Sequence, residues 1–292
     1  MNGRASAPAA GTVVNALATG RGCAFAIDLE TTASVTLSST DGISGTVLDR
    51  PDTDPSLVER CVERVLDRFA DRASVDLDPA GGRIETESDV PVASGLKSSS
   101  AAANAAVLAT LSALGLSDAV DPLEACRIGV DAARDVGVTV TGAFDDAAAS
   151  MLGGVVATDN TDDVVLSHTP VPTDWQAAIY TPPARSYSAD ADLDAVGAIA
   201  PVVELAEELA LSGRYAEAMS VNGLAYCAAL EHSTGPLLDA LPDAAGVSLS
   251  GTGPSFVAIG DPSALEVVVG RWSERPGQSQ LVDLRNDGAR IA

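Results

Sequence analysis

The sequence predicts an α+β protein that folds as one large domain or as two of modest size. Segments typical of strands and of helices follow one another without the strict alternation of a doubly wound sheet. The 292 residues are 46% hydrophobic, which suffices for a sizeable core. The apolar stretches are short, and none reaches the roughly 20 residues that a membrane-spanning helix needs. Because the N-terminus shows no signal peptide either, we expect a cytoplasmic protein without a membrane partner.

The first half of the chain is expected to hold both strands and helices. Runs of β-branched and apolar residues predict the strands, and apolar residues at helical spacing predict the amphipathic helix at 57–69. An Ala-rich helix is expected to end at Gly115, and another begins after Asp121, a typical capping residue. The expected strands are 24–29, 33–37, 84–90 and 155–158, and the expected helices are 57–69, 98–114, 122–134 and a short one within 142–152.

The second half mixes the two kinds of element in the same way, with turns rich in Gly, Asp and Pro between them. A cluster of Asp, Asn and Thr at 159–163 predicts a hairpin or a junction between two lobes. The expected strands are 175–180, 247–250, 256–259 and 281–285, and the expected helices are 189–210 and 215–232.

The charge of the chain limits its partners and its solvent. The sequence has 17 Lys and Arg against 41 Asp and Glu, a net charge of −24. Such a chain is not expected to bind nucleic acid, whose phosphates attract basic patches. The repulsion between its like charges would be screened at about 1 M salt, where the Debye length is about 3 Å. This composition therefore predicts a halophilic protein; the alternative is an acidic enzyme of a mesophile.

The chain contains a single lysine, Lys97, in a setting that predicts an anion site. Arg accounts for the other 16 basic residues, so keeping a lysine here indicates that a compact ammonium group is needed. Gly95 permits close approach of a ligand to the backbone. The hydroxyls of Ser98, Ser99 and Ser100 open the next helix, whose free N–H groups attract phosphate. We therefore expect a polyphosphate such as that of ATP, with Mg²⁺; the alternative is a serine-rich helix cap with an incidental lysine.

Three further segments could complete such a site. Gly251, Thr252 and Gly253 form a glycine turn between two apolar runs, where positive φ angles allow close approach to a phosphate. Asp145 and Asp146 lie at the start of a short helix, a position where carboxylates most often serve as caps. The third segment is the small, polar-flanked opening at residues 7–15.

Together these four segments resemble the GHMP kinase superfamily, which includes galactokinase, homoserine kinase and mevalonate kinase. Residues 91–102 match its second motif, P-x-x-x-G-L-x-S-S-A-A, with one additional Ser, and residues 251–255 match its third, G-x-G-P-S/T. Within the superfamily the chain looks most similar to the archaeal shikimate kinases. The strings that carry this likeness begin at residues 8, 24, 94 and 141, and the last, T-G-A-F-D-D-A-x-A-S-x-x-G-G, is long and specific.

The resemblance implies a two-lobed GHMP kinase fold and a kinase activity. Residues 1–160 would form an N-terminal lobe with a mixed sheet and the nucleotide-binding loop, and residues 161–292 a ferredoxin-like C-terminal lobe. The implied reaction is the ATP- and Mg²⁺-dependent phosphorylation of the 3-hydroxyl of shikimate, on the route to chorismate and the aromatic amino acids. Two alternatives stay open: a kinase for another small alcohol such as homoserine, and a nucleotide-binding regulator without activity. Monomer and homodimer also stay open.

The resemblance further implies roles for individual residues. Asp146 is the preferred catalytic residue and Asp145 the second choice, while Lys97 is inferred to contact the β- and γ-phosphates. Ser99 and Asp135, which lies eleven positions before Asp146, are the expected Mg²⁺ ligands. The substrate-side candidates, which include arginines for its carboxylate, are Asn15, Thr19, Arg21, Asp28 and Arg185. The nucleotide-side candidates are Pro91, Ala93, Ser94, Gly95, Leu96, Lys97, Ser98, Ser99, Ser100, Gly251, Thr252 and Gly253.

Overall fold

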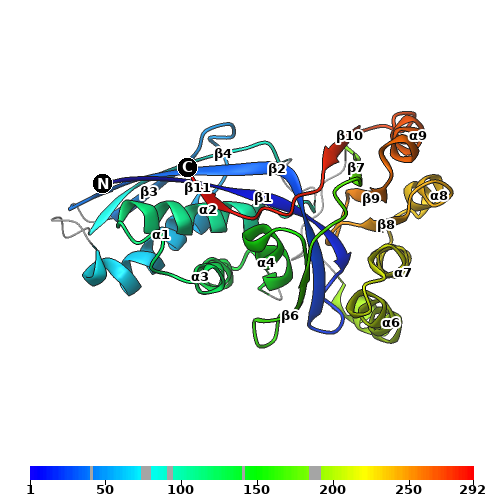
Figure 1. The fold of residues 1–292 in the computed structure, drawn as a ribbon, viewed down its shortest axis with the longest axis horizontal. Coiled ribbons are helices and arrows are strands. Elements are labelled where there is room, and N and C mark those ends of the chain that lie inside the picture. Colours follow the sequence, from blue (N-terminus) through cyan, green and yellow to red (C-terminus); the bar gives the residue numbers. More distant parts are fainter. Residues whose placement is uncertain (40–41, 74–79, 91–94, 140–141, 184–191) are drawn as a thin grey trace.

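The computed structural model describes residues 1–39, 42–73, 80–90, 95–139, 142–183 and 192–292, and within them it confirms the α+β class (Figure 1). The first of two sheets contains β1 (Asn2–Val14), β2 (Arg21–Ser38), β3 (Gly42–Val47), β4 (Gly81–Ser88), β5 (Val155–Asp159), β6 (Val164–Thr169) and β11 (Arg290–Ile291). Its strand order is β11-β1-β2-β4-β3, with β5 attached to β2 and β6 attached to β5. Among the described residues, no helix has both the length and the apolar character needed to cross a membrane.

The two longest strands, β1 and β2, pair as a long antiparallel ribbon that runs through the molecule (Figure 1). β2 changes partners along its length, because residues 21–25 pair with β5 and residues 31–38 pair with β4. β1 is missing from the strands that the sequence predicts, and β2 was expected as two. β1 is rich in Ala, Gly and Pro, which have little intrinsic strand preference, so burial rather than propensity makes it a strand.

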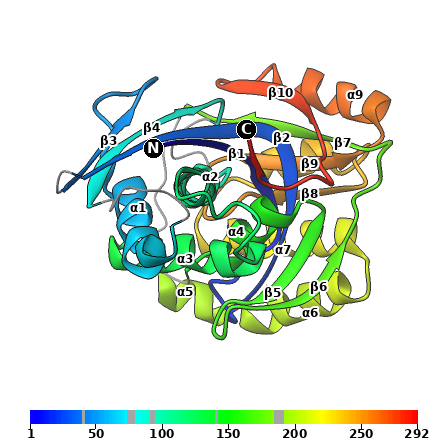
Figure 2. The same ribbon diagram turned by 60° about the vertical axis from the view of Figure 1, so that its left-hand side comes forward.

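Four helices cover one face of the first sheet (Figures 1 and 2). They are α1 (Ser56–Phe69), followed by the short 3-10 helix η1 (Ala70–Arg72), then α2 (Ser98–Ala113), α3 (Pro122–Asp135) and α4 (Phe144–Leu152). All four agree with the sequence-based expectations. α2 packs closely on β1, since a Cβ on Gly3 would lie 2.0 Å from the backbone oxygen of Ala109. This contact places the C-terminal part of α2 against the start of β1.

The second sheet is antiparallel in the order β10-β7-β9-β8. Its strands are β7 (Gln176–Thr181), β8 (Gly246–Leu249), β9 (Phe256–Gly260) and β10 (Gln278–Asp283), and its helices are α5 (Leu193–Ala198), α6 (Ala200–Leu211), α7 (Tyr215–Ala229), α8 (Gly235–Ala240) and α9 (Pro262–Trp272). The sequence predicted a single helix at 189–210. This prediction is wrong for the described part of that range, which forms two helices, because the chain leaves the helical conformation at Ile199, just before Pro201. α8 and α9 were not predicted.

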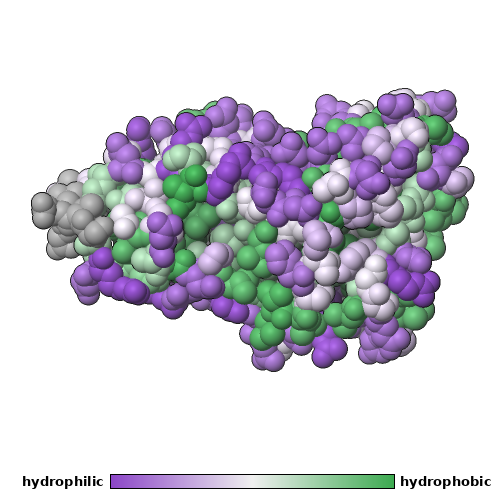
Figure 3. Space-filling model, viewed as in Figure 1, coloured by the Kyte–Doolittle hydropathy of each residue, from purple (hydrophilic) through white to green (hydrophobic). Residues whose placement is uncertain are grey.

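Two hydrophobic cores lie on either side of the β1–β2 ribbon. One joins α1–α4 to the first sheet, and the other joins the second sheet to residues near the Val14 end of β1, including Val13 and Phe25. The expected hairpin at 159–163 is present as the turn between β5 and β6. β6 and β11 follow residue 160 in the sequence but belong to the first sheet. The expected boundary between two lobes at residue 160 therefore stays a prediction. Figure 3 shows hydrophilic side chains over much of the visible face, with apolar areas between them.

Candidate active site

The loop before α2 places Lys97 beside a buried carboxylate. Lys97 has a left-handed backbone conformation, with a φ of 63°, that turns the chain into the helix. Its Nζ lies 2.8 Å from Oδ2 of Asp146, in the first turn of α4, and the two side chains are 13% and 6% exposed. Because the N-cap residue is a lysine, it offers no capping oxygen to the first N–H groups of α2. These N–H groups and the ammonium group together favour an anion.

The glycine turn between β8 and β9 packs directly on this loop. Oγ of Ser250 donates a hydrogen bond of 2.8 Å to the backbone oxygen of Gly95. Gly95 has a φ of 78°, and a Cβ there would lie 2.2 Å from the backbone oxygen of Ser250, so no other residue fits. A Cβ on Gly251 would lie 3.0 Å from Nζ of Lys97. The two glycine-containing loops therefore form one continuous surface around the ammonium group.

A buried polar network at the end of β1 holds the glycine turn in place. Nδ2 of Asn15 donates to the backbone oxygen of Gly251 over 2.8 Å, and the Gly251 N–H donates to Oγ1 of Thr12 over 2.9 Å. The Asn15 N–H donates to Oδ1 of Asn222, and the Tyr226 hydroxyl donates to the Asn15 oxygen. Asn15 was expected on the substrate side; the structure shows it as a support of the turn.

A cavity of about 390 Å³ opens beside the two loops. Its lining combines polar groups from both loops with an apolar wall from the region of β3 and α1. The lining residues used below are Val47, Arg50, Pro55, Leu57, Val58, Gly95, Lys97, Ser98, Ser99, Ser100, Asp146, Gly251, Thr252 and Gly253. Leu96, also expected on the nucleotide side, is instead buried in the second core. Arg50 and Lys97 are the cationic side chains among the described lining residues.

Asp146 has the properties of a proton acceptor. It is 4% exposed, and its Oδ1 has no hydrogen-bond partner among the described residues. Burial, together with the negative charge of Asp145, raises the pKa of Asp146 to about 7, and the Lys97 ammonium group only partly offsets this rise. A carboxylate with such a pKa can take a proton near neutral pH, as a general base does.

Asp145 is directed away from the cavity, although it is the neighbour of Asp146. Nδ2 of Asn160 donates to Oδ1 of Asp145 over 2.8 Å, and the Asp145 N–H donates to Oδ1 of Asn160 over 3.1 Å. A Cβ on Gly22 would lie 2.4 Å from Oδ2 of Asp145, so this carboxylate packs against β2. The geometry thus distinguishes two residues that the sequence left as alternatives.

Asp135, the expected partner of Ser99 in a metal site, is not brought to the cavity. Its Oδ2 lies 2.6 Å from Nε of Arg60 and 2.8 Å from Nε of Arg64, on the outer face between α1 and α3. The two guanidinium groups hold the pKa of Asp135 well below its usual range. The carboxylate is therefore already occupied, and the described residues contain no group of three or more His, Cys, Asp or Glu that could hold a metal.

The other substrate-side candidates are not gathered at the cavity either. Thr19 donates to Glu207, Arg21 pairs with Asp159 over 3.3 Å, and Asp28 lies 3.4 Å from Arg285. Arg21 lies opposite Asp159 where β2 pairs with β5, and Asp28 lies beside Arg285 of the C-terminal segment. The candidates Pro91, Ala93, Ser94 and Arg185 lie outside the described residues.

The structure adds residues that sequence reasoning missed. Ser250 directly precedes the glycine turn, so its position in the motif could have suggested a role. Thr12 lies in the opening at residues 7–15, but its contact with Gly251 is 239 residues away in the sequence. Asn222 and Tyr226 contact Asn15 from more than 200 residues away, and no motif marks them. Arg50 follows β3 in an ordinary Asp- and Pro-rich turn, and no local signal marks it as part of a cavity.

Known proteins match the chain over its whole length. Residues 56–154 match the family model of the GHMP kinases N terminal domain. The shikimate kinase of Halobacterium salinarum is 57% identical over 291 residues, which cover 99% of each chain. The shikimate kinase of Methanothrix thermoacetophila is 47% identical over 292 residues, which cover 100% of this chain and 96% of that one.

Solved structures share the fold at low sequence identity. The homoserine kinase of Cytophaga hutchinsonii has a TM-score of 0.76 at 19% identity and covers 100% of this chain and 97% of its own. A galactokinase of Lactococcus lactis, complexed with galactose, has a TM-score of 0.70 at 16% identity, with 99% and 95% coverage. These likenesses establish the two-lobed GHMP kinase fold. With the full-length identities above, they show that the chain belongs to the shikimate kinase family of the GHMP kinases.

Proposed function

We propose that the protein transfers the γ-phosphoryl group of ATP to the 3-hydroxyl of shikimate, forming shikimate 3-phosphate and ADP. The reaction would serve the biosynthesis of chorismate and the aromatic amino acids. The observation that carries the proposal is the buried Lys97–Asp146 pair at the cavity, where one Asp146 oxygen has no hydrogen-bond partner in the described part of the chain. The likeness to archaeal shikimate kinases supports shikimate as the acceptor.

The cavity offers a suitable place for the phosphate chain of ATP. In a molecule with a net charge of −24, a polyphosphate needs a local region of positive potential. The N-terminus of α2 and the Lys97 ammonium group supply one. The hydroxyls of Ser98 and Ser100 line the same cavity and can donate to phosphate oxygens.

Mg²⁺ would neutralise phosphate charge at this site. A serine hydroxyl is an oxygen ligand of the kind that Mg²⁺ accepts, alongside phosphate oxygens and water. Ser99 lines the cavity and is our candidate for this contact. A site completed mainly by the nucleotide and by water is consistent with the lack of a carboxylate cluster in the described chain.

Asp146 and Lys97 have different roles in the phosphoryl transfer. Oδ1 of Asp146 accepts the proton of the acceptor hydroxyl while the hydroxyl oxygen forms a bond to phosphorus and the bond to ADP breaks. Lys97 stabilises the negative charge on the transferring group, and it holds Oδ2 of Asp146 so that Oδ1 stays available. Because the pair is largely buried, water has little access to the proton that Asp146 accepts.

The apolar wall of the cavity suits the nucleobase. Val47, Pro55, Leu57 and Val58 line this wall, and apolar side chains favour a planar base over water. Arg50 lines the same cavity and donates through Nη2 to the backbone oxygen of Val90, just before the Lys97 loop. We assign Arg50 to the nucleotide side of the cavity, where its charge would attract phosphate.

The decisive experiment compares acceptors in a coupled assay of ADP release, in molar KCl with Mg²⁺. High salt is chosen because the acidic composition supports function in a salt-rich cytoplasm. Shikimate, homoserine and mevalonate are tested separately, and we expect kcat/KM for shikimate to exceed the others by at least about 100-fold. A preference for homoserine would reassign the acceptor. ATP binding without turnover of any alcohol would indicate a regulator.

A further inference from the structure

Helix α4, which carries Asp146, has no side-chain hydrogen bond from its N-cap residue, Ala143, among the described residues. Gly142 and Ala143 precede it with φ angles of 85° and 50°, and alanine has no side-chain oxygen for the N–H groups of the first turn. An isolated helix with such a start would fray. Side chains that reach this turn from other elements therefore help to fix the position of Asp146.

One side chain outside the helix supplies this support. Oδ1 of Asn160 accepts from the Asp145 N–H over 3.1 Å, and Nδ2 of Asn160 donates to Oδ1 of Asp145 over 2.8 Å. Thr158 Oγ1 donates to Oδ1 of Asn160 over 2.6 Å and orients the amide. The Asn160 N–H donates to the backbone oxygen of Gly20. These hydrogen bonds are buried, because Asn160, Thr158 and Asp145 are all at most 3% exposed.

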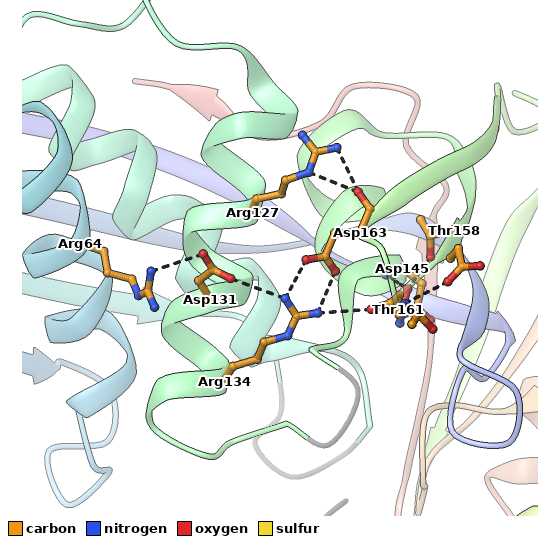
Figure 4. Close-up of polar contacts among 10 residues, drawn as sticks. Arg64, Arg127, Asp131, Arg134, Asp145, Thr158, Thr161 and Asp163 are labelled. Atoms are coloured by element: carbon orange, nitrogen blue, oxygen red, sulfur yellow. Dashed lines mark hydrogen bonds and ion pairs between the residues drawn. The ribbon is translucent and has the colours of Figure 1, made fainter.

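Two arginines of α3 support the same region from its other side (Figure 4). Arg134 donates to both carboxylate oxygens of Asp163, over 2.7 and 2.8 Å, and to the backbone oxygen of Asn160 over 3.3 Å. Its guanidinium group lies against Gly142, where a Cβ would be 2.4 Å away. Arg127 lies over the ring of Phe144, 5.6 Å from its centroid, and donates to the backbone oxygen of Asp163.

We propose that Asn160 is a positioning residue for phosphoryl transfer, because its amide fixes residue 145 and so directs the next carboxylate, Asp146, to the cavity. The inference rests on the proposed kinase function. An amide suits the place, since residue 145 presents both an N–H that needs an acceptor and a carboxylate that needs a donor. The negative charge of Asp145 acts on Asp146, Cys23 and Tyr226, and none of these three groups is a cation.

The test exchanges the two side chains. Asn160→Asp alone places a carboxylate against that of Asp145, and we expect kcat to fall roughly 100-fold, the cost of a displacement of about 1 Å at a reacting group. KM for ATP should change less than about twofold, because the Lys97 loop and the glycine turn are untouched. The double variant Asn160→Asp/Asp145→Asn restores one donor, one acceptor and the same net charge, and we expect it to recover kcat to within about fivefold of the wild type.

A matched control separates positioning from a general loss of stability. Asn286→Asp disturbs the pair of hydrogen bonds between Asn286 and Val171, which lies outside the cavity, and should lower the unfolding temperature but not kcat. Normal kcat in Asn160→Asp would overturn the proposal. So would a folded double variant, with wild-type affinity for ATP, that stays as slow as the single one. Failure of wild-type turnover with shikimate is a separate result and concerns the acceptor; the exchange is then repeated with the alcohol that is phosphorylated.

Discussion

Asp135 and Asp146 both lie within 3 Å of a cationic nitrogen, yet the pKa values of the two carboxylates are shifted in opposite directions. Asp135 accepts hydrogen bonds from Arg60 and Arg64 on the outer face, and these hold its pKa well below the usual range. Asp146 pairs with Lys97 at 2.8 Å, but burial and the charge of Asp145 raise its pKa to about 7. Ion-pair distance alone therefore does not decide whether a carboxylate holds a proton.

The contrast follows from what surrounds each pair. Asp135 is about 30% exposed, so water and two guanidinium groups stabilise its charge. Asp146 is buried and accepts from one ammonium group, and among the described residues its Oδ1 has no hydrogen-bond partner. An occupied surface carboxylate contributes to structure, whereas a buried and partly satisfied one can exchange a proton. Replacing each residue in turn tests this distinction.

The largest difference is expected when each carboxylate is replaced by its amide. Asp146→Asn removes the proton acceptor, so kcat should fall by about 1000-fold or more while ATP still binds. Asp135→Asn is the matched control and should leave kcat within about twofold. Steady-state kinetics and calorimetric titration with ATP measure both effects. Near-normal turnover in Asp146→Asn would transfer the role to Asp145.

The cation of the buried pair should matter nearly as much. Lys97→Ala removes an electrostatic contact to the transferring group worth about 2–4 kcal/mol. We therefore expect kcat/KM to fall roughly 30- to 1000-fold. Lys97→Arg should restore little activity, because Gly251 leaves only about a Cβ-sized space beside Nζ. Unchanged kcat/KM in Lys97→Ala would show that the lone lysine has no catalytic role.

The raised pKa of Asp146 predicts how the reaction responds to pH. A base must be deprotonated to act, so kcat should rise about tenfold per pH unit up to about pH 7 and then level off. Asp145→Asn removes the neighbouring negative charge that favours the protonated form, and the acidic limb should move to lower pH. A profile of kcat between pH 5 and 9 measures both. An unshifted limb in Asp145→Asn would mean that burial alone sets the pKa.

The parts of this site that could be predicted from sequence are short and contiguous. The Lys97 loop, the glycine turn and the pair Asp145–Asp146 each carry their chemistry within a few residues, so glycine, hydroxyl and charge patterns were enough to find them. The apolar spacing of α1 likewise predicted a helix, because one face of it packs against a core. Local patterns succeed where local chemistry determines the structure.

The remaining features depend on contacts between distant parts of the chain. The spacing of Asp135 from Asp146 matched a family pattern, but α1 supplies Arg60 and Arg64 to it from across the fold. The choice between Asp145 and Asp146 is made by Asn160, fifteen residues after the first of them. The strand β1 has a weak local preference, and its long register with β2 forms only in the folded protein.

The same contrast between a surface pair and a cavity residue applies to arginines. Arg50 lines the cavity and pairs with Asp49 over 3.3 Å, whereas Arg21 pairs with Asp159 outside the cavity. Arg50→Ala should raise KM for ATP roughly tenfold, as expected for the loss of a hydrogen bond between charged groups. Arg21→Ala is the control and should leave both KM values unchanged. A rise in KM for shikimate instead would place Arg50 at the acceptor.

The smallest effect is expected for the stability of the Asp135 cluster. Its carboxyl pKa is lower in the folded than in the unfolded chain, so the cluster stabilises the fold above about pH 4 and loses this contribution as pH falls further. Because the groups are partly exposed, Asp135→Asn should lower the free energy of unfolding by only about 0.5–1 kcal/mol. Urea titrations should show a constant difference from pH 8 to 5 that shrinks in molar KCl, where surface charges are screened. A larger loss that salt does not reduce would mean that the cluster acts through packing, and the contrast with Asp146 would then no longer be one of solvent exposure.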